Sequence, residues 1–95
     1  MAAYIVADID ITDPAAYEGY KPLASAAIEK YGAKILVRGG KVEPAEGGWE
    51  PKRLVILEFP SMDKLKAFYT SPEYRKAIAI RQKASKGRLI FVEGV

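Results

Sequence analysis

The sequence predicts an α+β domain whose elements follow in the order β-α-β-β-α-β, with the second helical region broken in two. Three observations predict it: one alternating stretch with a wholly apolar side, three further stretches rich in branched apolar residues, and two helix starts in which a capping residue precedes proline. Because crossover connections are right-handed, this order indicates a four-stranded, antiparallel-rich sheet of the ferredoxin-like type with helices on one face.

The first predicted strand is residues 2–11, where successive side chains point to opposite faces of the sheet. One face is wholly apolar and consists of Ile5, Ala7, Ile9 and Ile11. The other carries Tyr4, Val6, Asp8 and Asp10.

The first helical region begins at Asp13-Pro14, an N-cap followed by proline at the first helical position. We expect the helix to run to Tyr31, to be kinked or restarted at Pro22, and to end at Gly32.

Two strands follow at residues 33–38 and 53–59, and the second is the most apolar in the chain. Within 33–38, one face carries Lys34, Leu36 and Arg38, and the other carries Ile35 and Val37. We expect strand 53–59 to lie beside strand 2–11 and parallel to it.

The second helical region has two starts. Ser61 caps a short helix, and Ser71, followed by proline, opens a helix over about residues 72–84. We expect Gly87 to break that helix before a last strand in 88–94.

Helices on one face of this sheet leave the other face bare. The apolar side chains expected there are Tyr4, Val6, Leu36, Leu54 and Ile56. An exposed apolar face of this size normally marks an interface, and so small a domain is only modestly stable alone. The sequence therefore predicts a homodimer in which two such sheets face each other and enclose a barrel-like interior.

The 95 residues leave room for one domain, 1–95, and 49% hydrophobic with 28% charged residues is the composition of a folded chain. There is no Cys, His or Asn. Disulfides, thiolate chemistry, imidazole bases, Ser-His-Asp machinery and the usual zinc, haem and non-haem iron ligand sets are therefore excluded. We expect no metal and assign no cofactor.

The net charge of +3 is spread along the chain without a basic block, so we expect no nucleic-acid partner. The N-terminal stretch MAAYIVADIDITD lacks a basic region and an apolar run long enough for export or membrane spanning. We therefore expect no membrane partner and a cytoplasmic location.

Several unusual motifs recur in order along the chain. The run RGG, followed by EGGWEPKRLVILEFPS, then AFYTSPEYRKA and IRQKA, resembles the family catalogued as domain of unknown function 1330. The resemblance extends from about Tyr4 to Val95 and implies the ferredoxin-like fold of the dimeric α+β barrel superfamily. Relatives in that superfamily include cofactor-free monooxygenases, lactone isomerases, dehydratases and haem enzymes, so the resemblance implies little about activity.

Glu58 is the candidate catalytic residue. It shares the predicted barrel-facing side of its strand with Leu54 and Ile56, and a parallel neighbour would bring Asp8 close to it. Two shielded carboxyls repel each other, and one pKa then rises into the range that a general acid or base needs. The alternative is a cross-strand ion pair with Lys34 that holds the register of the sheet.

Arg38 and Arg53 are candidate ligand-binding residues that bracket the long connection RGGKVEPAEGGWEPKR. A guanidinium offers paired hydrogen bonds to a carboxylate or phosphate. Arg38 shares a strand face with Lys34 and should point into the barrel interior. The alternative is ion pairing with Glu43, Glu46, Glu50 or Glu93.

Trp49 is the only tryptophan and lies in the same connection, beside the second of two Gly-Gly pairs. It either plugs the barrel mouth or contacts the partner subunit, or forms a wall of a ligand cavity, or lies at an unstructured loop tip.

The tyrosines of the helical regions are expected to pack in the core or at its rim; they are Tyr17, Tyr20, Tyr31, Tyr69 and Tyr74. Tyr69, in the break between the two helices beside Ser71, is the tyrosine we expect to contact a ligand. Arg81 falls on the apolar side of its helix and is a further candidate ligand residue, although a salt bridge is the commonest reason for such a placement.

These residues support a small-molecule enzyme that acts on an apolar or aromatic compound with an anionic or carbonyl group. Acid-base or cofactor-free oxygenase-type chemistry is feasible with them, and a conventional triad is not. The alternatives are a non-catalytic ligand-binding module and a dimeric interaction module whose barrel is filled by side chains.

Overall fold

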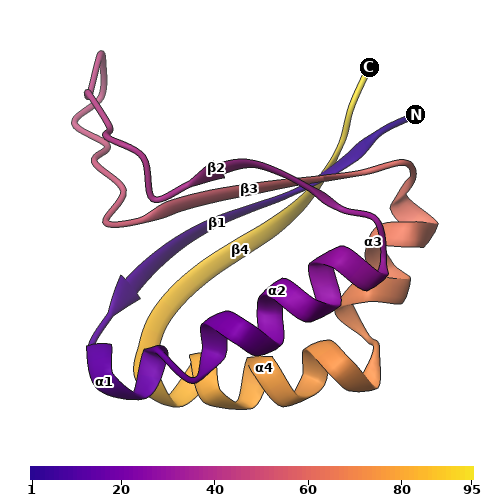
Figure 1. Ribbon diagram of the computed structural model, residues 1–95. Helices are drawn as coiled ribbons and strands as arrows, with labels where there is room; N and C mark the ends of the chain where they lie inside the picture. The colour runs from indigo at the N-terminus through magenta and orange to yellow at the C-terminus, as the bar shows by residue number, and fades with distance from the viewer.

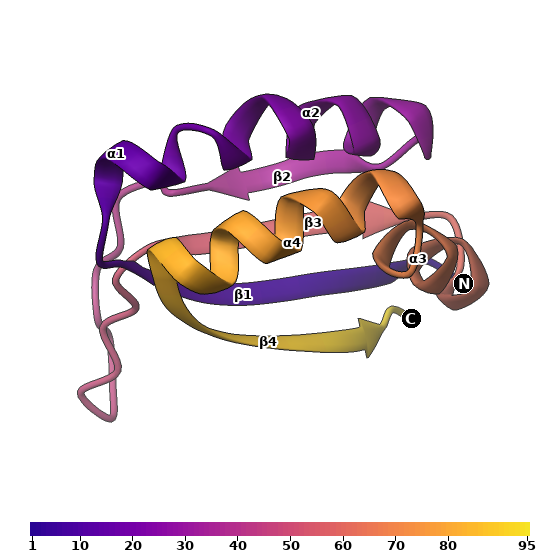
Figure 2. The ribbon, with the colours of Figure 1, turned by 90° about the horizontal axis from the view of Figure 1, so that it is seen from below.

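The computed structural model describes all residues 1–95 and shows one four-stranded sheet with every helix on the same face (Figure 1, Figure 2). The elements in chain order are β1 (Ala3–Ile11), α1 (Pro14–Tyr17), α2 (Tyr20–Lys30), β2 (Lys34–Arg38), β3 (Leu54–Phe59), α3 (Met62–Tyr69), α4 (Pro72–Ala84) and β4 (Ser85–Glu93). The strand order is β2-β3-β1-β4 and every neighbouring pair is antiparallel. This confirms the α+β, ferredoxin-like fold. None of the helices is long and apolar enough to cross a membrane.

The expected parallel pairing of the first and third strands is wrong. They are neighbours, but Ala3 faces Phe59 and Asp8 faces Leu54, so they run in opposite directions. The crossover helix joins β1 to β2, which makes those two strands the codirectional pair. β3 returns from β2 and lies between them.

Three side-chain caps start helices where the sequence predicts them. Asp13 accepts from the Ala16 amide, Ser61 from the Lys64 amide and Ser71 from the Tyr74 amide. Each cap satisfies an amide that would otherwise lack a partner at a helix N-terminus.

The break in the first helical region lies at Glu18-Gly19, ahead of Pro22. Pro22 falls in the first turn of α2, where a missing N–H leaves no intrahelical hydrogen bond unmade. The expected stop at Gly32 is confirmed, with a φ of 70° that favours glycine.

Gly87 does not break α4. The helix ends at Ala84, and Ser85 begins β4 directly. Gly87 is a strand residue opposite Ile9, and a Cβ there would lie 2.8 Å from Ile9 Cδ1. Close approach between β4 and β1 therefore explains this glycine.

A β-bulge changes the face of one candidate residue. The β2–β3 register is regular at Ile35 and Leu57, but Leu36 is skipped, so Val37 faces Ile56 and Arg38 faces Val55. One extra residue reverses the facing of everything after it. Arg38 is therefore on the helix-covered side, and its expected position beside Lys34 on the bare face is wrong.

The layer between helices and sheet has a densely packed end near α3. Its largest fully buried side chains are Phe59, Phe68 and Leu65. The Phe59 and Phe68 rings lie 5.1 Å apart, and the Phe68 and Tyr74 rings 4.3 Å apart. Aromatic rings at these separations contribute both buried area and favourable ring contacts.

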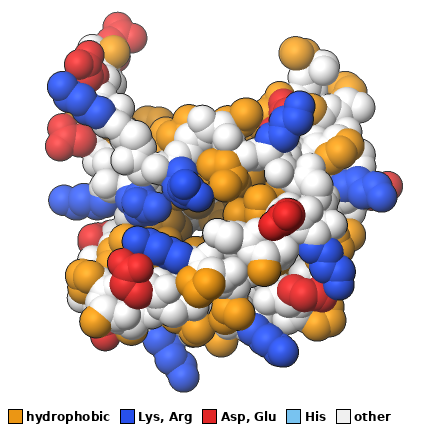
Figure 3. Space-filling view, viewed as in Figure 1, with side chains coloured by type: hydrophobic (Ala, Val, Ile, Leu, Met, Phe, Trp, Pro, Cys, Tyr) orange, Lys and Arg blue, Asp and Glu red, His pale blue; other side chains and the backbone are white.

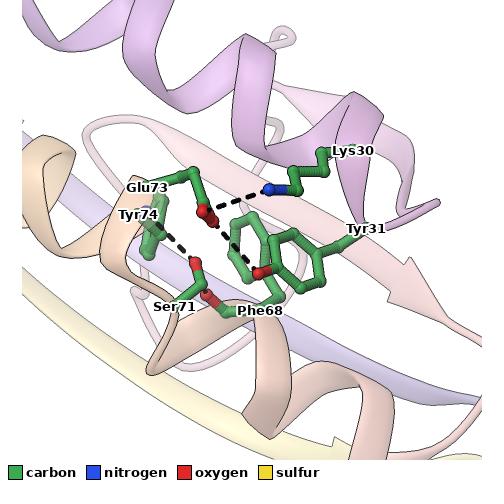
Figure 4. Close-up of polar contacts among 6 residues, drawn as sticks. All are labelled: Lys30, Tyr31, Phe68, Ser71, Glu73 and Tyr74. Atoms are coloured by element: carbon green, nitrogen blue, oxygen red, sulfur yellow. Dashed lines mark hydrogen bonds and ion pairs between the residues drawn. The ribbon is translucent and has the colours of Figure 1, made fainter.

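Polar contacts join α2 to α4 above that packed end (Figure 4). Glu73 accepts from the Tyr31 hydroxyl at 3.1 Å and from Lys30 Nζ at 3.4 Å. Desolvation alone would raise the pKa of the Glu73 carboxyl, but these two donors outweigh it and lower the pKa below its ordinary value of 4.5.

The sheet face opposite the helices is bare and apolar. The exposed fractions of Leu36, Ile90 and Val92 are 50%, 57% and 40%. The connection 39–53 and the chain termini rise on this side of the sheet, so the face forms the floor of a hollow with apolar side chains (Figure 1, Figure 3).

Candidate functional site: a cavity with three arginines

A cavity of about 320 Å³ lies between the helices and the sheet. Twelve of its 17 lining residues are hydrophobic, and the other five include three arginines: Arg38, Arg53 and Arg81. The remaining lining residues are Ile5, Ala7, Ile9, Tyr17, Tyr20, Lys21, Ala24, Ser25, Ile28, Ile35, Val55, Leu57, Tyr74 and Leu89. A predominantly apolar concavity with a few convergent polar groups is typical of a small-molecule site.

Small side chains open this space. Ala7 from β1 faces the helices, and Ala24 and Ser25 from α2 line the same cavity. The helices of the packed end, in contrast, send large aromatic rings onto the sheet. The short side chains of Ala7, Ala24 and Ser25 therefore do not fill the space between α2 and the sheet.

Arg81 is the most deeply placed of the arginines, with only 8% of its surface exposed. It forms no ion pair; Nη1 donates to the Tyr74 hydroxyl at 3.0 Å. A buried cation is costly unless it is paired, and a neutral phenol provides no negative charge. The expected salt bridge of Arg81 is absent, so the guanidinium charge is not compensated by any carboxylate of the chain.

Arg53 also lacks a carboxylate partner, and its buried Nε has no hydrogen-bond acceptor. Its side chain crosses Gly39, where a Cβ would lie 2.5 Å from Arg53 Nη1. Gly39 has a φ of 69° and thus serves both the turn and this close approach. Arg38, at the end of β2, forms no ion pair with any of the glutamates expected as alternatives.

Three tyrosines lie among the arginines. The Tyr20 and Tyr74 hydroxyl oxygens are 2.7 Å apart, and the rings of Tyr17 and Tyr20 are 5.1 Å apart. Burial raises the pKa of each of the three phenols above its ordinary value of 10.0, and the Arg81 charge opposes each shift. The hydroxyls are therefore protonated at neutral pH.

The pKa of Arg81 is raised, although burial alone would lower it. The opposing cause is the neighbouring tyrosines, which carry negative charge only at the high pH where phenols ionise. At neutral pH these tyrosines are neutral and do not compensate the guanidinium.

Glu58 lies on the bare face, on the other side of the sheet from the cavity. The expectation that Asp8 lies beside Glu58 is wrong, because antiparallel pairing places Tyr4 and Lys34 opposite Glu58. The Tyr4 hydroxyl donates to Glu58 Oε2 at 3.2 Å, and no ion pair joins Glu58 to Lys34. Asp8 instead accepts from the Lys52 amide at 3.0 Å and from Arg88 Nη2 at 3.3 Å.

Trp49 and Tyr69 do not line the arginine cavity. Trp49 is 59% exposed and borders a shallow groove on the bare face with Val6, Leu54 and Ile90. Tyr69 is half-buried, with its ring 5.1 Å from that of Phe91. No group of three or more carboxylates comes together as a metal site.

The sequence interpretation missed three cavity residues that it assigned to packing: Tyr17, Tyr20 and Tyr74. Tyr17, Tyr20, Ala24 and Ile28 do lie at helical spacing, so the stripe itself was visible. Nothing local showed that a cavity rather than a side chain faces this stripe.

The chain matches the family model described as Domain of unknown function (DUF1330) over residues 2–95. It belongs to that family. No curated protein matches the chain.

Solved structures share the fold at low sequence identity. A protein of unknown function from Rhodopseudomonas palustris has a TM-score of 0.74 and 20% identity, with 99% of this chain and 82% of that chain covered. SnoaB, a cofactor-independent oxygenase from Streptomyces nogalater, has a TM-score of 0.67 and 10% identity, with 99% and 93% covered. A dimeric protein of unknown function and ferredoxin-like fold from Bacteroides fragilis has a TM-score of 0.65 and 17% identity, with 98% and 96% covered. At these identities the likeness shows the fold.

Proposed function

We propose that this protein binds an apolar or aromatic small molecule with an anionic or carbonyl oxygen in the arginine cavity. The observation that carries the proposal is Arg81, a buried guanidinium without a carboxylate partner at the wall of an apolar cavity. Arg38 and Arg53 add two further unpaired cations. An anionic ligand would supply the missing charge, while its apolar part would displace water from the remaining walls.

A matched pair of fluorescent ligands tests this proposal. The aromatic sulfonate 8-anilinonaphthalene-1-sulfonate and its uncharged analogue N-phenyl-1-naphthylamine differ only in the anionic group. We expect Arg81→Met to weaken sulfonate binding by about tenfold or more, since a hydrogen bond to a charged group contributes about 1.5–3 kcal/mol. The uncharged analogue should bind both proteins alike.

Arg75→Met is the control, because Arg75 is an exposed arginine of the same helix that does not line the cavity. Equal sulfonate binding by wild type and Arg81→Met would contradict the proposal. Arg38→Ala should preserve folding, since Arg38 is exposed and unpaired, and should weaken sulfonate binding less than Arg81→Met does. Native mass spectrometry of freshly purified protein would show whether a natural ligand remains bound.

Catalysis in the same cavity is the second candidate function. The three arginines and the cavity tyrosines can stabilise the enolate of a bound substrate whose proton passes to solvent, and the likeness to a cofactor-independent oxygenase supports oxygen chemistry. In such a reaction a deprotonated substrate itself transfers electrons to O₂. Anthrone is a suitable probe, since anthrone and O₂ balance to anthraquinone and water. Oxygen uptake no faster than without the protein would favour the non-catalytic binding module.

Glu58 remains a candidate acid-base residue only for a reaction on the bare face. Glu58→Gln should leave anthrone oxidation unchanged if the arginine cavity is the reaction site, and a loss of activity would move the site to the other face of the sheet. Trp49, which borders that face, then becomes the ligand-contacting residue to test.

We also propose that the bare face binds a second copy of the chain. The exposed Leu36, Ile90 and Val92, the apolar hollow on that side of the sheet, and the dimeric Bacteroides fragilis neighbour support this assembly. Leu36→Asp should convert the dimer to monomer in size-exclusion chromatography with light scattering. Ala26→Asp, an equal change on the exposed surface of α2, should not. A dimer that survives Leu36→Asp would contradict the assembly.

A further inference from the structure

The contact between the Tyr20 and Tyr74 hydroxyls does not by itself show which of them donates, but the neighbouring Arg81 decides it. A guanidinium has donors and no acceptor, so Arg81 donates to the Tyr74 oxygen across their 3.0 Å contact. The hydroxyl hydrogen of Tyr74 then needs an acceptor of its own, because only 3% of the residue is exposed. The Tyr20 oxygen, 2.7 Å away, is the only other hydrogen-bond partner of the Tyr74 hydroxyl.

Tyr20 is therefore the end of a chain that runs from Arg81 through Tyr74. Its oxygen accepts from Tyr74, and its own hydrogen has no acceptor within the protein. Tyr20 is only partly buried and lines the arginine cavity. Each donor in such a chain polarises the next, and the charge of Arg81 strengthens the effect.

We propose that the Tyr20 hydroxyl is the hydrogen-bond donor to the anionic oxygen of the ligand, and that Arg81 and Tyr74 position and polarise it. This inference rests on the proposed binding function and narrows the ligand class to aromatic compounds with a phenolate, enolate or carboxylate oxygen. The three arginines supply positive charge around that oxygen, and Tyr20 supplies one directed contact.

4-Nitrophenol is a suitable probe because its colour reports ionisation, and 4-nitroanisole is its counterpart that cannot ionise. Benzoate distinguishes a carboxylate ligand from a phenolate one. We expect wild type to bind the phenolate and to lower the pH at which bound 4-nitrophenol ionises. Tyr20→Phe should weaken phenolate binding by about tenfold or more and leave 4-nitroanisole binding unchanged.

Tyr74→Phe tests the direction of the chain. If Tyr74 donates to Tyr20, its removal should weaken phenolate binding by about threefold. If Tyr20 instead donates to Tyr74, loss of the Tyr74 hydroxyl frees the Tyr20 hydrogen. Phenolate binding by Tyr74→Phe that is equal to or tighter than that of wild type would therefore overturn the proposed direction. Tyr31→Phe is the control, because that hydroxyl donates to Glu73 and does not line the cavity.

The outcomes separate the two proposals. A wild-type protein that binds phenolate, with Tyr20→Phe binding it equally well, would overturn the role of Tyr20 and leave the binding function intact. A wild-type protein that binds neither 4-nitrophenol nor benzoate would overturn the binding function and this inference together. If thermal melting shows that Tyr20→Phe does not fold, Tyr74→Phe provides the test, and unchanged binding by that variant counts against the proposal.

Discussion

The two ends of the layer between helices and sheet are built from opposite choices of side chain. Near α3, Phe59, Phe68 and Leu65 are fully buried, and none of them lines the cavity. Toward α1, Ala7 and Ala24 line a cavity whose walls include three arginines that form no ion pair. The first end stabilises the fold, while the second retains an energetic cost that a ligand can offset.

This difference shows how one small core serves both stability and function. Because a domain of this size has little stability to spare, an unfilled volume and unpaired cations are tolerated only when the rest of the core is well packed. The polar contacts of Glu73 across α2 and α4 reinforce the packed end (Figure 4). Substitutions at the two ends should therefore change the free energy of unfolding by different amounts and in different directions.

The largest expected effect is at the packed end. Phe68→Ala should lower the free energy of unfolding by about 3–5 kcal/mol, because it removes a fully buried ring and leaves a void. Ile28 is a half-buried residue of the cavity wall, so Ile28→Ala should lower the free energy of unfolding clearly less. Urea unfolding followed by circular dichroism at one fixed protein concentration measures both. Equal costs would show that the two ends do not differ in packing.

The next effect concerns the cavity rim. Gly39→Ala should lower the free energy of unfolding by about 1–2 kcal/mol for the positive φ, and by more through the clash with Arg53. Gly47→Ala has the same strain, with a φ of 77°, but no atom within 4 Å, so it isolates the conformational cost. Gly40→Ala has neither problem and should be neutral. A Gly39→Ala cost no greater than that of Gly47→Ala would mean that Arg53 moves freely aside.

A smaller change in the free energy of unfolding, of opposite sign, is expected at the cavity. Arg81→Met should raise the free energy of unfolding by about 1 kcal/mol, since it removes a buried unpaired charge and keeps much of the side-chain volume. The same variant should lose anion binding, as proposed above. Thermal and urea unfolding without ligand provide the measurement, and a destabilised variant would show that the Tyr74 contact outweighs the desolvation of the charge.

The smallest effect is a pH dependence at the packed end. Because the folded pKa of Glu73 is lowered, the carboxylate contributes stability above its ordinary pKa of 4.5, and that stability is lost as pH falls through the folded value. Wild type should therefore be more stable than Glu73→Gln near neutral pH, and the two should converge in acid. A difference that persists unchanged in acid would argue against the Tyr31 and Lys30 contacts as its source.

Much of the fold was predictable because its signals are local. The caps at Asp13, Ser61 and Ser71, the left-handed Gly32 and the alternation in β1 each depend on a few neighbouring residues. The bounds of α4 were predictable for the same reason, but the role of Gly87 was not, because its cause is the approach of another strand.

The candidate site was only partly predictable. The sequence singled out Arg38, Arg53 and Arg81, which the fold brings to one cavity. It also singled out Glu58, Trp49 and Tyr69, which the fold places elsewhere. Residue type indicates what chemistry a side chain can perform, whereas its surroundings depend on which strands pair and in which direction.

By itself the sequence determined the order of elements, the helix starts, the apolar face of β1 and the exclusion of thiol and imidazole chemistry. Only the tertiary structure decided that Arg38 faces the helices, because one bulge residue in β2 shifts its register against β3. Only the tertiary structure showed that Arg81 lacks a carboxylate, since an ion pair depends on residues far apart in the chain. A cavity, likewise, is the space that several distant elements leave between them, and no single stretch of sequence encodes it.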